Sequence, residues 1–265
     1  MRPYFSGFLN NDYSMKMIID NFDDSLALRS ELSSLQMKGY HLLYRGHASN
    51  SFELLSMVGR KIPINGNLLD SEKRCFQDYK DYIADRNWIQ YKVSSYNDNL
   101  FYMSIGRHLG LDWRLLDWTA RLETALFFAS ADEGVVHENG HLWIMIYKGS
   151  VDDANAKIDP FDIKRVALIK KDYLVPQNMS MENFPLGEQR RFAQNGFFTI
   201  VPTDLLTTPL DHIPLNNMIL KKVEITANAK KNILSALSKC YEDYLYKRNS
   251  IIETDIKRIN SMYFE

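Results

Sequence analysis

Arginines gather in three short segments of this sequence, each next to a glycine or an apolar run. The segments are Tyr44-Arg45-Gly46-His47, the stretch from Arg107-His108-Leu109-Gly110 to Arg114-Leu115-Leu116-Asp117-Trp118-Thr119, and Arg190-Arg191-Phe192-Ala193-Gln194-Asn195-Gly196. The planar fork of arginine grips phosphate or carboxylate at two points, whereas lysine presents a compact point charge. If the three segments are neighbours in the fold, they line a single pocket for an anionic ligand.

Each segment also has a plain structural interpretation. Arg45 ends a predicted strand, and the glycine after it lets backbone approach a ligand closely, but pairing with a buried carboxylate explains the arginine equally well. Period-two alternation places Asp117 and Thr119 on one side of a strand, where they would project into a shared site. The alternative is that Asp117 caps the helix that follows. Arg190 and Arg191 bind the ligand or belong to a solvated charged turn.

The elements that must position these residues follow from hydrophobic periodicity and from turn signals. Helices are expected over 24–38, with Leu26, Leu32, Leu35 and Met37 on the apolar face, and over 71–88, capped by Asp70 or Ser71. Further helices are expected over 98–109, ending at Gly110, and over 122–131 and 228–244, the last capped by Thr226. Strands are expected over 40–44, 113–119, 142–147, 197–201 and 220–225, and 152–187 as a long, partly structured excursion. The order is mixed, so we predict an α+β fold, a single domain with a central antiparallel or mixed sheet flanked by helices.

One metal-site pattern is present, because His137-Glu138-Asn139-Gly140-His141 matches the H-E-x-x-H motif of zinc proteases. That motif requires a helix, which brings both imidazoles to one zinc ion. Asn-Gly is instead a strong turn signal, so we expect a turn here and no metal.

The composition excludes several classes of protein. The chain has 265 residues, of which 45% are hydrophobic and 25% charged, with a net charge of −1, so it lacks the overall basic character of many nucleic-acid-binding proteins. Nucleic acid remains open as a partner. Cys75 and Cys240 lie far apart and are expected to be buried thiols. The first residues contain no apolar signal region and no stretch is long enough to span a membrane, so we expect a cytoplasmic protein without membrane contact.

The arginine segments resemble the FRG domain family, which is named for its aromatic-Arg-Gly motif. The resemblance rests on Tyr44-Arg45-Gly46, on Arg114-Leu115-Leu116-Asp117-Trp118-Thr119 followed by Ala125-Leu126-Phe127-Phe128-Ala129, and on Arg191-x-x-Gln194-x-Gly196-x-Phe198. It covers about residues 40 to 240, so residues 1–39 are expected to form a helical extension packed on a domain over 40–265. This chain departs from the family pattern at Arg107, Leu109, Asp112-Trp113 and His47.

The resemblance implies a bacterial or phage-linked defence or toxin protein. Its layout is similar to that of mono-ADP-ribosyltransferases, a fold-level analogy that implies NAD as substrate and either ADP-ribosyl transfer or NAD hydrolysis. The implied cofactor-binding residues are Tyr44, Arg45, Gly46, His47, Arg114 and Arg191. The implied catalytic residues are Asp117, Thr119, Gln194 and, in reserve, Glu188. The implied partners are a nucleotide or dinucleotide, a macromolecular acceptor and an inhibitory protein. The alternative is a binding or sensor module without chemistry, and phosphodiester hydrolysis ranks last because no carboxylate cluster for two metals is present.

Overall fold

The structure is a computed structural model that describes residues 17–85, 98–149, 158–170, 196–215, 217–245 and 250–265. The chain divides into two compact units. Unit 1 comprises Met1–Glu53, Trp118–Gly149 and Leu215–Leu245, and unit 2 comprises Leu54–Asp117, Ser150–Pro214 and Tyr246–Glu265. Each unit therefore combines segments that lie far apart in the sequence.

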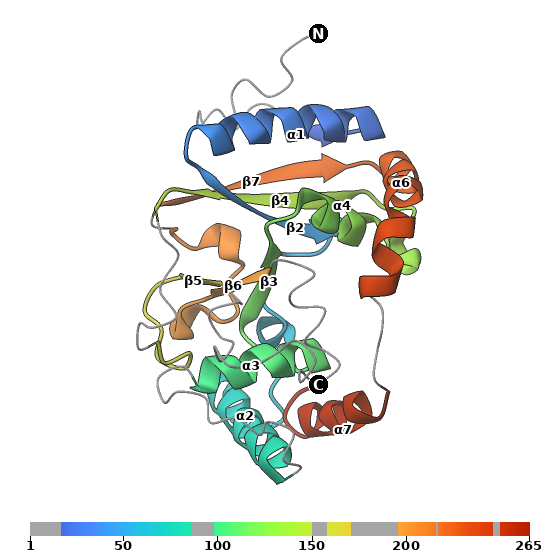
Figure 1. Ribbon diagram of the computed structural model, residues 1–265. Helices are drawn as coiled ribbons and strands as arrows, with labels where there is room; N and C mark the ends of the chain where they lie inside the picture. Colours follow the sequence, from blue (N-terminus) through green and yellow to red (C-terminus); the bar gives the residue numbers. More distant parts are fainter. Residues whose placement is uncertain (1–16, 86–97, 150–157, 171–195, 216, 246–249) are drawn as a thin grey trace. The chain divides into compact units, whose positions relative to one another are not determined.

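Unit 1 is a mixed sheet packed against helices (Figure 1). Its strands are hydrogen-bonded in the order β1 (Ile18–Ile19), β7 (Met218–Ile225), β4 (Gly140–Tyr147), β2 (His41–His47) and the end of β3 (Leu115–Thr119). β1 runs parallel to β7, and the other pairs are antiparallel. The helices are α1 (Phe22–Met37), α4 (Leu122–Ser130) and α6 (Ala227–Leu245).

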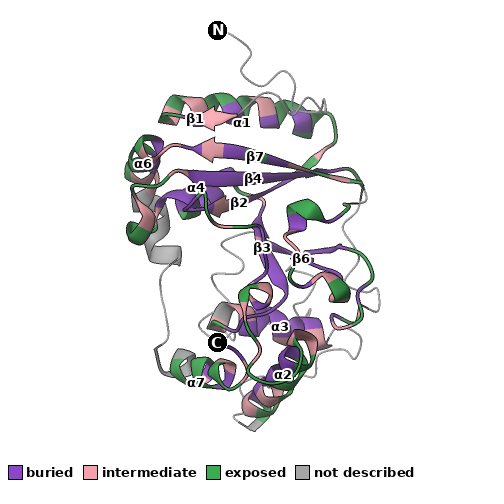
Figure 2. Ribbon diagram, turned by 180° about the vertical axis from the view of Figure 1, so that it is seen from behind, coloured by how far each residue is buried: buried purple, intermediate pink, exposed green. Residues whose placement is uncertain are grey.

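One face of this sheet forms the hydrophobic core with the helices. The core takes alternate strand residues together with buried residues of the three helices, among them Tyr44, Ile144, Val223, Leu28, Leu32, Ala125, Leu126 and Ile233. Because side chains alternate between the two faces of a strand, the residues between them, Arg45, Trp143 and Lys222, belong to the opposite face. β4 is buried along its whole length (Figure 2).

Capping residues fix the ends of α1. The side chain of Asn21 accepts a hydrogen bond from the Asp24 backbone N–H at 3.0 Å, and Asp24 accepts from the Asn21 N–H at 3.2 Å, which is a capping box. Gly39, with a φ of +80°, ends the helix in the left-handed conformation. The apolar face of α1 consists of Leu28, Leu32 and Leu35, whereas Met37 of the predicted face is exposed.

Unit 2 holds the remaining helices and strands. The helices are α2 (Leu68–Asp85), α3 (Asp98–Leu109) and α7 (Ser250–Ser261), and the strand order is the start of β3, then β6 (Gly196–Ile200), then β5 (Ala167–Lys170). β5 and β6 are antiparallel. The C-terminal segment is held to α2 by two phenol hydrogen bonds, from Tyr82 to Asp255 at 2.7 Å and from Tyr263 to Asp78 at 2.6 Å.

The predicted α+β class with a mixed sheet is confirmed, and so are most of the predicted elements. The helix over 98–109 has the predicted bounds, Gly110 has a φ of +101°, and the Thr226 hydroxyl accepts from Ala229 N–H at the start of α6. Asn67, rather than Asp70 or Ser71, caps α2, because its side-chain oxygen accepts from the Asp70 N–H. β1, β5 and α7 were not predicted. The domain boundary after residue 39 stays a prediction, although Leu28, Leu32 and Leu35 of α1 belong to the core of unit 1.

The predicted turn at the H-E-x-x-H match is confirmed. His137 and Glu138 lie in a turn and a bend, and His141 belongs to β4, so the helix that the zinc motif needs is not formed. In the part of the chain that the structure describes, no group of three or more His, Cys, Asp or Glu side chains is arranged to hold a metal ion. Cys75 is a buried free thiol whose pKa is raised by burial, and the side chain of Cys240 lies outside the described residues. None of the described helices combines the length and apolar character that crossing a bilayer demands.

Candidate functional site

Arg45 and His47 lie on the face of β2 that is turned away from the helices of unit 1. Arg45 Nε donates a hydrogen bond to His47 Nε2 at 3.0 Å, and His47 Nδ1 lies 3.2 Å from the carbonyl oxygen of Phe52. Since a guanidinium can only donate, Nε2 of His47 must be the unprotonated nitrogen, and Nδ1–H donates to Phe52. A neutral imidazole therefore orients the half-buried guanidinium of Arg45.

Tyr44 and Gly46 lie on the other face of β2, against α4. A Cβ atom on Gly46 would lie 1.9 Å from the carbonyl oxygen of Ala125 and 2.6 Å from the backbone nitrogen of Ala129. The glycine was expected to let a ligand approach the backbone. On the side to which a Cβ atom of residue 46 would point, that expectation is wrong, because the backbone of α4 fills the space. Tyr44 belongs to the core, and burial, followed by the charge of Glu123, raises the pKa of its phenol.

The sheet register extends the face of Arg45 across three strands. Arg45 lies opposite Trp143 of β4, which lies opposite Lys222 of β7. Lys222 Nζ lies 5.1 Å from the centroid of the Trp143 ring, a cation–π contact. The next row on the same face contains His47, His141 and Glu224. Arginine, lysine, tryptophan and histidine thus occupy adjacent positions on one surface of unit 1.

A buried lysine fixes the backbone beside this surface. Lys230 of α6 is fully buried, and its ammonium donates to the carbonyl oxygens of Ala48 at 2.7 Å, Val135 at 2.8 Å and Glu138 at 2.9 Å. Burial lowers the pKa of Lys230, and the negative charge of Glu138 partly opposes that shift. The contacts hold the segment after His47 and the turn before β4 to one helix, and Ser49 adds a hydrogen bond to the Glu138 carboxylate.

Thr119 lies in unit 1, but on the face of the helices. It is opposite Tyr44 in the β2–β3 pair, and its hydroxyl accepts from the Arg121 N–H at 3.1 Å. Opposite residues of an antiparallel pair share a face, so Thr119 is on the side of Tyr44 and not on that of Arg45. Its described contact orders the backbone at the start of α4.

Asp117 lies in unit 2 and is paired with Arg107. Arg107 Nε is 3.0 Å from Asp117 Oδ2, without the geometry of a hydrogen bond, and both side chains remain about one quarter exposed, 21% and 27%. Asp117 is not the N-cap residue of α4, which is Arg121, and the side chain of Arg121 makes no capping hydrogen bond. Arg107, where the family pattern has glutamine, thus has a partner inside the second motif.

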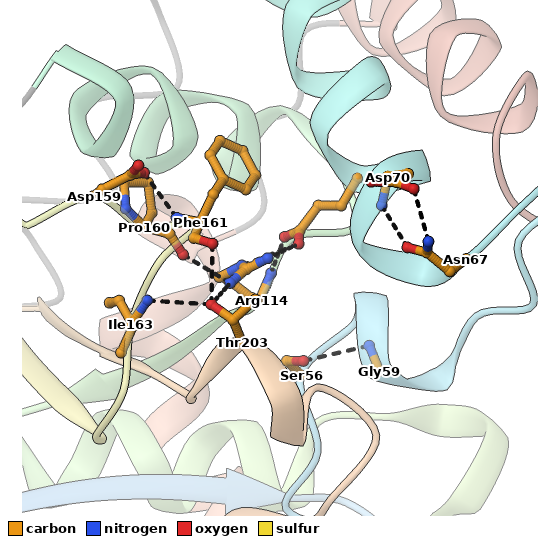
Figure 3. A network of polar contacts seen from close by, with 11 residues as sticks. Ser56, Gly59, Asn67, Asp70, Arg114, Asp159, Pro160, Phe161, Ile163 and Thr203 are labelled. Atoms are coloured by element: carbon orange, nitrogen blue, oxygen red, sulfur yellow. Dashed lines mark hydrogen bonds and ion pairs between the residues drawn. The ribbon is translucent and has the colours of Figure 1, made fainter.

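Arg114 is the centre of a buried polar network in unit 2 (Figure 3). Its Nε donates to the Glu72 carboxylate at 3.0 Å, and its Nη1 donates to the carbonyl oxygen of Pro160 at 2.7 Å and to the Thr203 hydroxyl at 3.2 Å. The ring of Phe161 lies against the guanidinium at 5.2 Å. Arg114 and Glu72 are both fully buried, so this arginine holds β3, α2 and the segments around 160 and 203 together.

Arg190 to Asn195 of the third arginine segment lie outside the described residues, as does Glu188. The predictions for Glu188, Arg191 and Gln194 therefore fall on residues that the structure does not describe. Arg45 and Thr119 belong to unit 1, and Asp117 and Arg114 to unit 2. The meeting of the three segments in one pocket therefore stays a prediction, as do the assigned roles of these residues.

Sequence reasoning missed four residues that lie on the same sheet face as Arg45. They are His141, Trp143, Lys222 and Glu224, which alternate with apolar residues along two strands. That alternation was a usable signal in both strands, since Lys222 and Glu224 flank Val223 and His141 and Trp143 flank Leu142.

Comparison with known families agrees with the first two arginine segments, whereas the matched stretch ends before the third. The family model described as FRG domain matches residues 40–137, a stretch that includes Arg45, Arg107 and Arg114 to Thr119. The chain contains an FRG domain. The match runs from the start of β2 to the turn before β4, so the aromatic-Arg-Gly strand and α4, which fills the space beside its glycine, are both parts of the FRG domain. Neither a curated protein nor a solved structure matches the chain.

Proposed function

We propose that this FRG-domain protein binds NAD by its phosphates at Arg45 and cleaves the bond between nicotinamide and ribose. The observation that carries the proposal is the hydrogen bond from Arg45 to His47, in which a neutral imidazole orients a half-buried guanidinium. An arginine held in this way is prepared to grip a phosphate in two places, and little side-chain entropy is lost when the ligand arrives.

The neighbours of Arg45 favour a nucleotide over a simple anion. Trp143 and Lys222 lie on the same sheet face. A dinucleotide carries a diphosphate with two negative charges, and the two cations of this face, Arg45 and Lys222, can each neutralise one of them. Two cations on one face therefore match a diphosphate better than a small anion with a single charge.

The proposed chemistry breaks one bond and forms one. The C1′–N bond of the nicotinamide ribose breaks, nicotinamide leaves with the electron pair, and the oxygen of water or of an acceptor forms the new bond at C1′ and releases a proton. The ribose develops oxocarbenium character, which a carboxylate stabilises. Asp117 and Glu188 are the proposed carboxylates, and Gln194 is proposed to position the ribose. Thr119 lies on the sheet face opposite to that of Arg45, so it has no ligand role in this proposal. Arg107 beside Asp117 weakens that role for Asp117, so Glu188 becomes the stronger candidate.

The test is release of nicotinamide from NAD by the purified full-length protein, with and without cell lysate as a source of acceptors. Arg45→Ala is expected to abolish release, and Glu188→Gln and Asp117→Asn ask which carboxylate is needed. Arg29→Ala is the matched control, because Arg29 is 61% exposed and paired with Glu123 on the helical side of unit 1. Transfer of labelled ADP-ribose would identify the acceptor class. Equal release by wild type and Arg45→Ala would overturn the proposal.

The alternative is a nucleotide sensor without chemistry. It is favoured by the ion pair between Arg107 and Asp117, which engages a carboxylate that was assigned to catalysis. A sensor would gain thermal stability with NAD or ADP-ribose and release no nicotinamide.

The family resemblance adds a biological setting to the proposal. In a bacterial or phage-linked defence or toxin system, an enzyme of this kind would deplete NAD or modify a macromolecule, and an inhibitory partner would keep it silent. Expression of the wild type should lower cellular NAD and slow growth, and Arg45→Ala should do neither.

A further inference from the structure

The indole N–H of Trp143 is a buried hydrogen-bond donor without a partner among the described residues. Trp143 is 4% exposed, and its Nε1 has no hydrogen-bond acceptor within the described parts of the chain. A buried polar group without a partner is destabilising and uncommon in folded proteins. The orphaned donor therefore points to an acceptor supplied from outside the described residues.

The residues beside Trp143 indicate what kind of acceptor this is. Arg45 lies opposite it on one neighbouring strand and Lys222 on the other, and opposite side chains on one sheet face leave the backbone about 5 Å apart. Lys222 is exposed and stays within 5.1 Å of the ring centroid. A guanidinium, an indole N–H and an ammonium can only donate, so an anion is the ligand that suits all three.

Trp113 offers a contrast within the same chain. Its Nε1 is also buried without a partner, but it lies against Gly106, where an added Cβ would be only 2.7 Å from that nitrogen. Trp113 is fully buried and packs between the rings of Phe76 and Tyr79. Its orphaned donor is explained by tight packing inside unit 2, and it serves as a control.

We propose that Trp143 and Lys222 complete the phosphate site of Arg45. The Trp143 N–H donates to a phosphate oxygen of the ligand that Arg45 grips, and Lys222, stacked on the indole, adds the second positive charge. The ligand class is the diphosphate group of a nucleotide. This inference rests on the proposed binding of a nucleotide at Arg45, but it does not depend on cleavage of that nucleotide.

The test follows the indole N–H resonances of the four tryptophans in ¹⁵N-labelled full-length protein during titration with ADP, NAD and inorganic diphosphate. Comparison with Trp143→Phe identifies the resonance of Trp143. That resonance is expected to move as each ligand saturates, while the resonance of Trp113 stays in place. Should Trp143→Phe fail to fold, Lys222→Ala supplies the assignment, because it removes the ammonium beside the ring.

Affinity provides the second measurement. Trp143→Phe keeps an aromatic ring without the N–H donor, so ADP should bind it about tenfold more weakly, the usual effect of losing one hydrogen bond to a charged group. Lys222→Gln should weaken binding as well and should reduce its salt dependence.

The outcomes separate this inference from the proposed function. If ADP and NAD bind in an Arg45-dependent way while the Trp143 resonance does not move and Trp143→Phe binds normally, this inference is overturned and the nucleotide site stands. If the wild type binds none of the three ligands, both fail. If the Trp143 resonance moves with ADP but no nicotinamide is released from NAD, the site stands and the proposed catalysis fails.

Discussion

Arg114→Met should destabilise the protein severely, because it leaves the Glu72 carboxylate buried without its counter-charge. Both side chains are fully buried, and the guanidinium donates to Glu72 at 3.0 Å and to Pro160 at 2.7 Å. Removing one partner of a buried ion pair typically costs about 3–5 kcal/mol. For a chain of this size that loss corresponds to a decrease in melting temperature of roughly 6–20 °C.

The assay is urea unfolding followed by far-UV circular dichroism, with a double variant as the decisive control. Arg114→Met combined with Glu72→Gln removes both charges. In the wild type the Glu72 carboxylate accepts a hydrogen bond from the backbone N–H of residue 114 at 3.0 Å, and the amide oxygen of the glutamine can still accept it. The double variant should be more stable than Arg114→Met alone. A single-variant loss below about 1 kcal/mol, or a double variant that loses the sum of both single losses, would refute the assignment of Arg114 as a structural arginine.

Arg45→Met is expected to show the opposite behaviour. Its described bond is to a neutral histidine at the half-buried surface of β2, so its loss should lower the free energy of unfolding by about 1 kcal/mol. Binding of ADP or NAD should be lost in the same variant. These results would separate two arginines that the sequence assigned to one ligand into a ligand residue and a structural residue, and a large stability loss in Arg45→Met would remove that distinction.

Three further variants test the supporting structure. Gly46→Ala should lower the free energy of unfolding by about 3 kcal/mol or more, because the added Cβ would lie 1.9 Å from the helix backbone. Gly134→Ala is the control and should be tolerated, because its Cβ would lie 3.3 Å from the nearest atom. Thermal unfolding compares the two variants. Burial lowers the pKa of Lys230 in the folded protein below its ordinary value of 10.5. Between these two pKa values the unfolded chain binds more protons than the folded one, so the free energy of unfolding rises with pH in that range. Lys230→Met should abolish this rise when urea unfolding is measured at several pH values. The bond to Asp78 raises the pKa of Tyr263 to about 12, so the stabilisation by this bond is present below pH 10.0 and is lost as pH rises through 12. Tyr263→Phe should remove a step near pH 12 from the tyrosine absorbance curve.

The local elements could be predicted from the sequence, because their signals are local. The helix that ends at Gly110 and the buried strand that follows Asn139-Gly140 both have an apolar run next to a turn residue. The face of α1 was harder to assign, since Leu26 and Leu28 both fit a helical repeat. Leu28 is buried and Leu26 is 46% exposed, a choice that packing against the sheet decides and that the sequence of the helix alone does not contain.

The candidate site was only half predictable, because partners distant in sequence decide what each arginine does. Glu72, the partner of Arg114, is 42 residues away and lies on a helix whose periodicity carries no sign of a buried ion pair. Trp143 and Lys222 join Arg45 only through strand register, which depends on pairing between distant segments. A one-residue slip of β4 against β2 would replace Trp143 by an apolar neighbour and remove the surface.

The aromatic-Arg-Gly motif is best understood as a strand whose two faces carry different tasks. Tyr44 packs into the core and Gly46 lets the backbone of α4 come close, so the helical face fixes the position of β2. Arg45, between them, is directed to the opposite face, where His47 orients its guanidinium. A substitution at Tyr44 or Gly46 should therefore act on stability first and on ligand binding only through the displaced strand, whereas one at Arg45 should act on binding directly. Measuring unfolding and ADP binding on Tyr44→Phe, Arg45→Met and Gly46→Ala would show whether the two faces are as independent as this geometry requires.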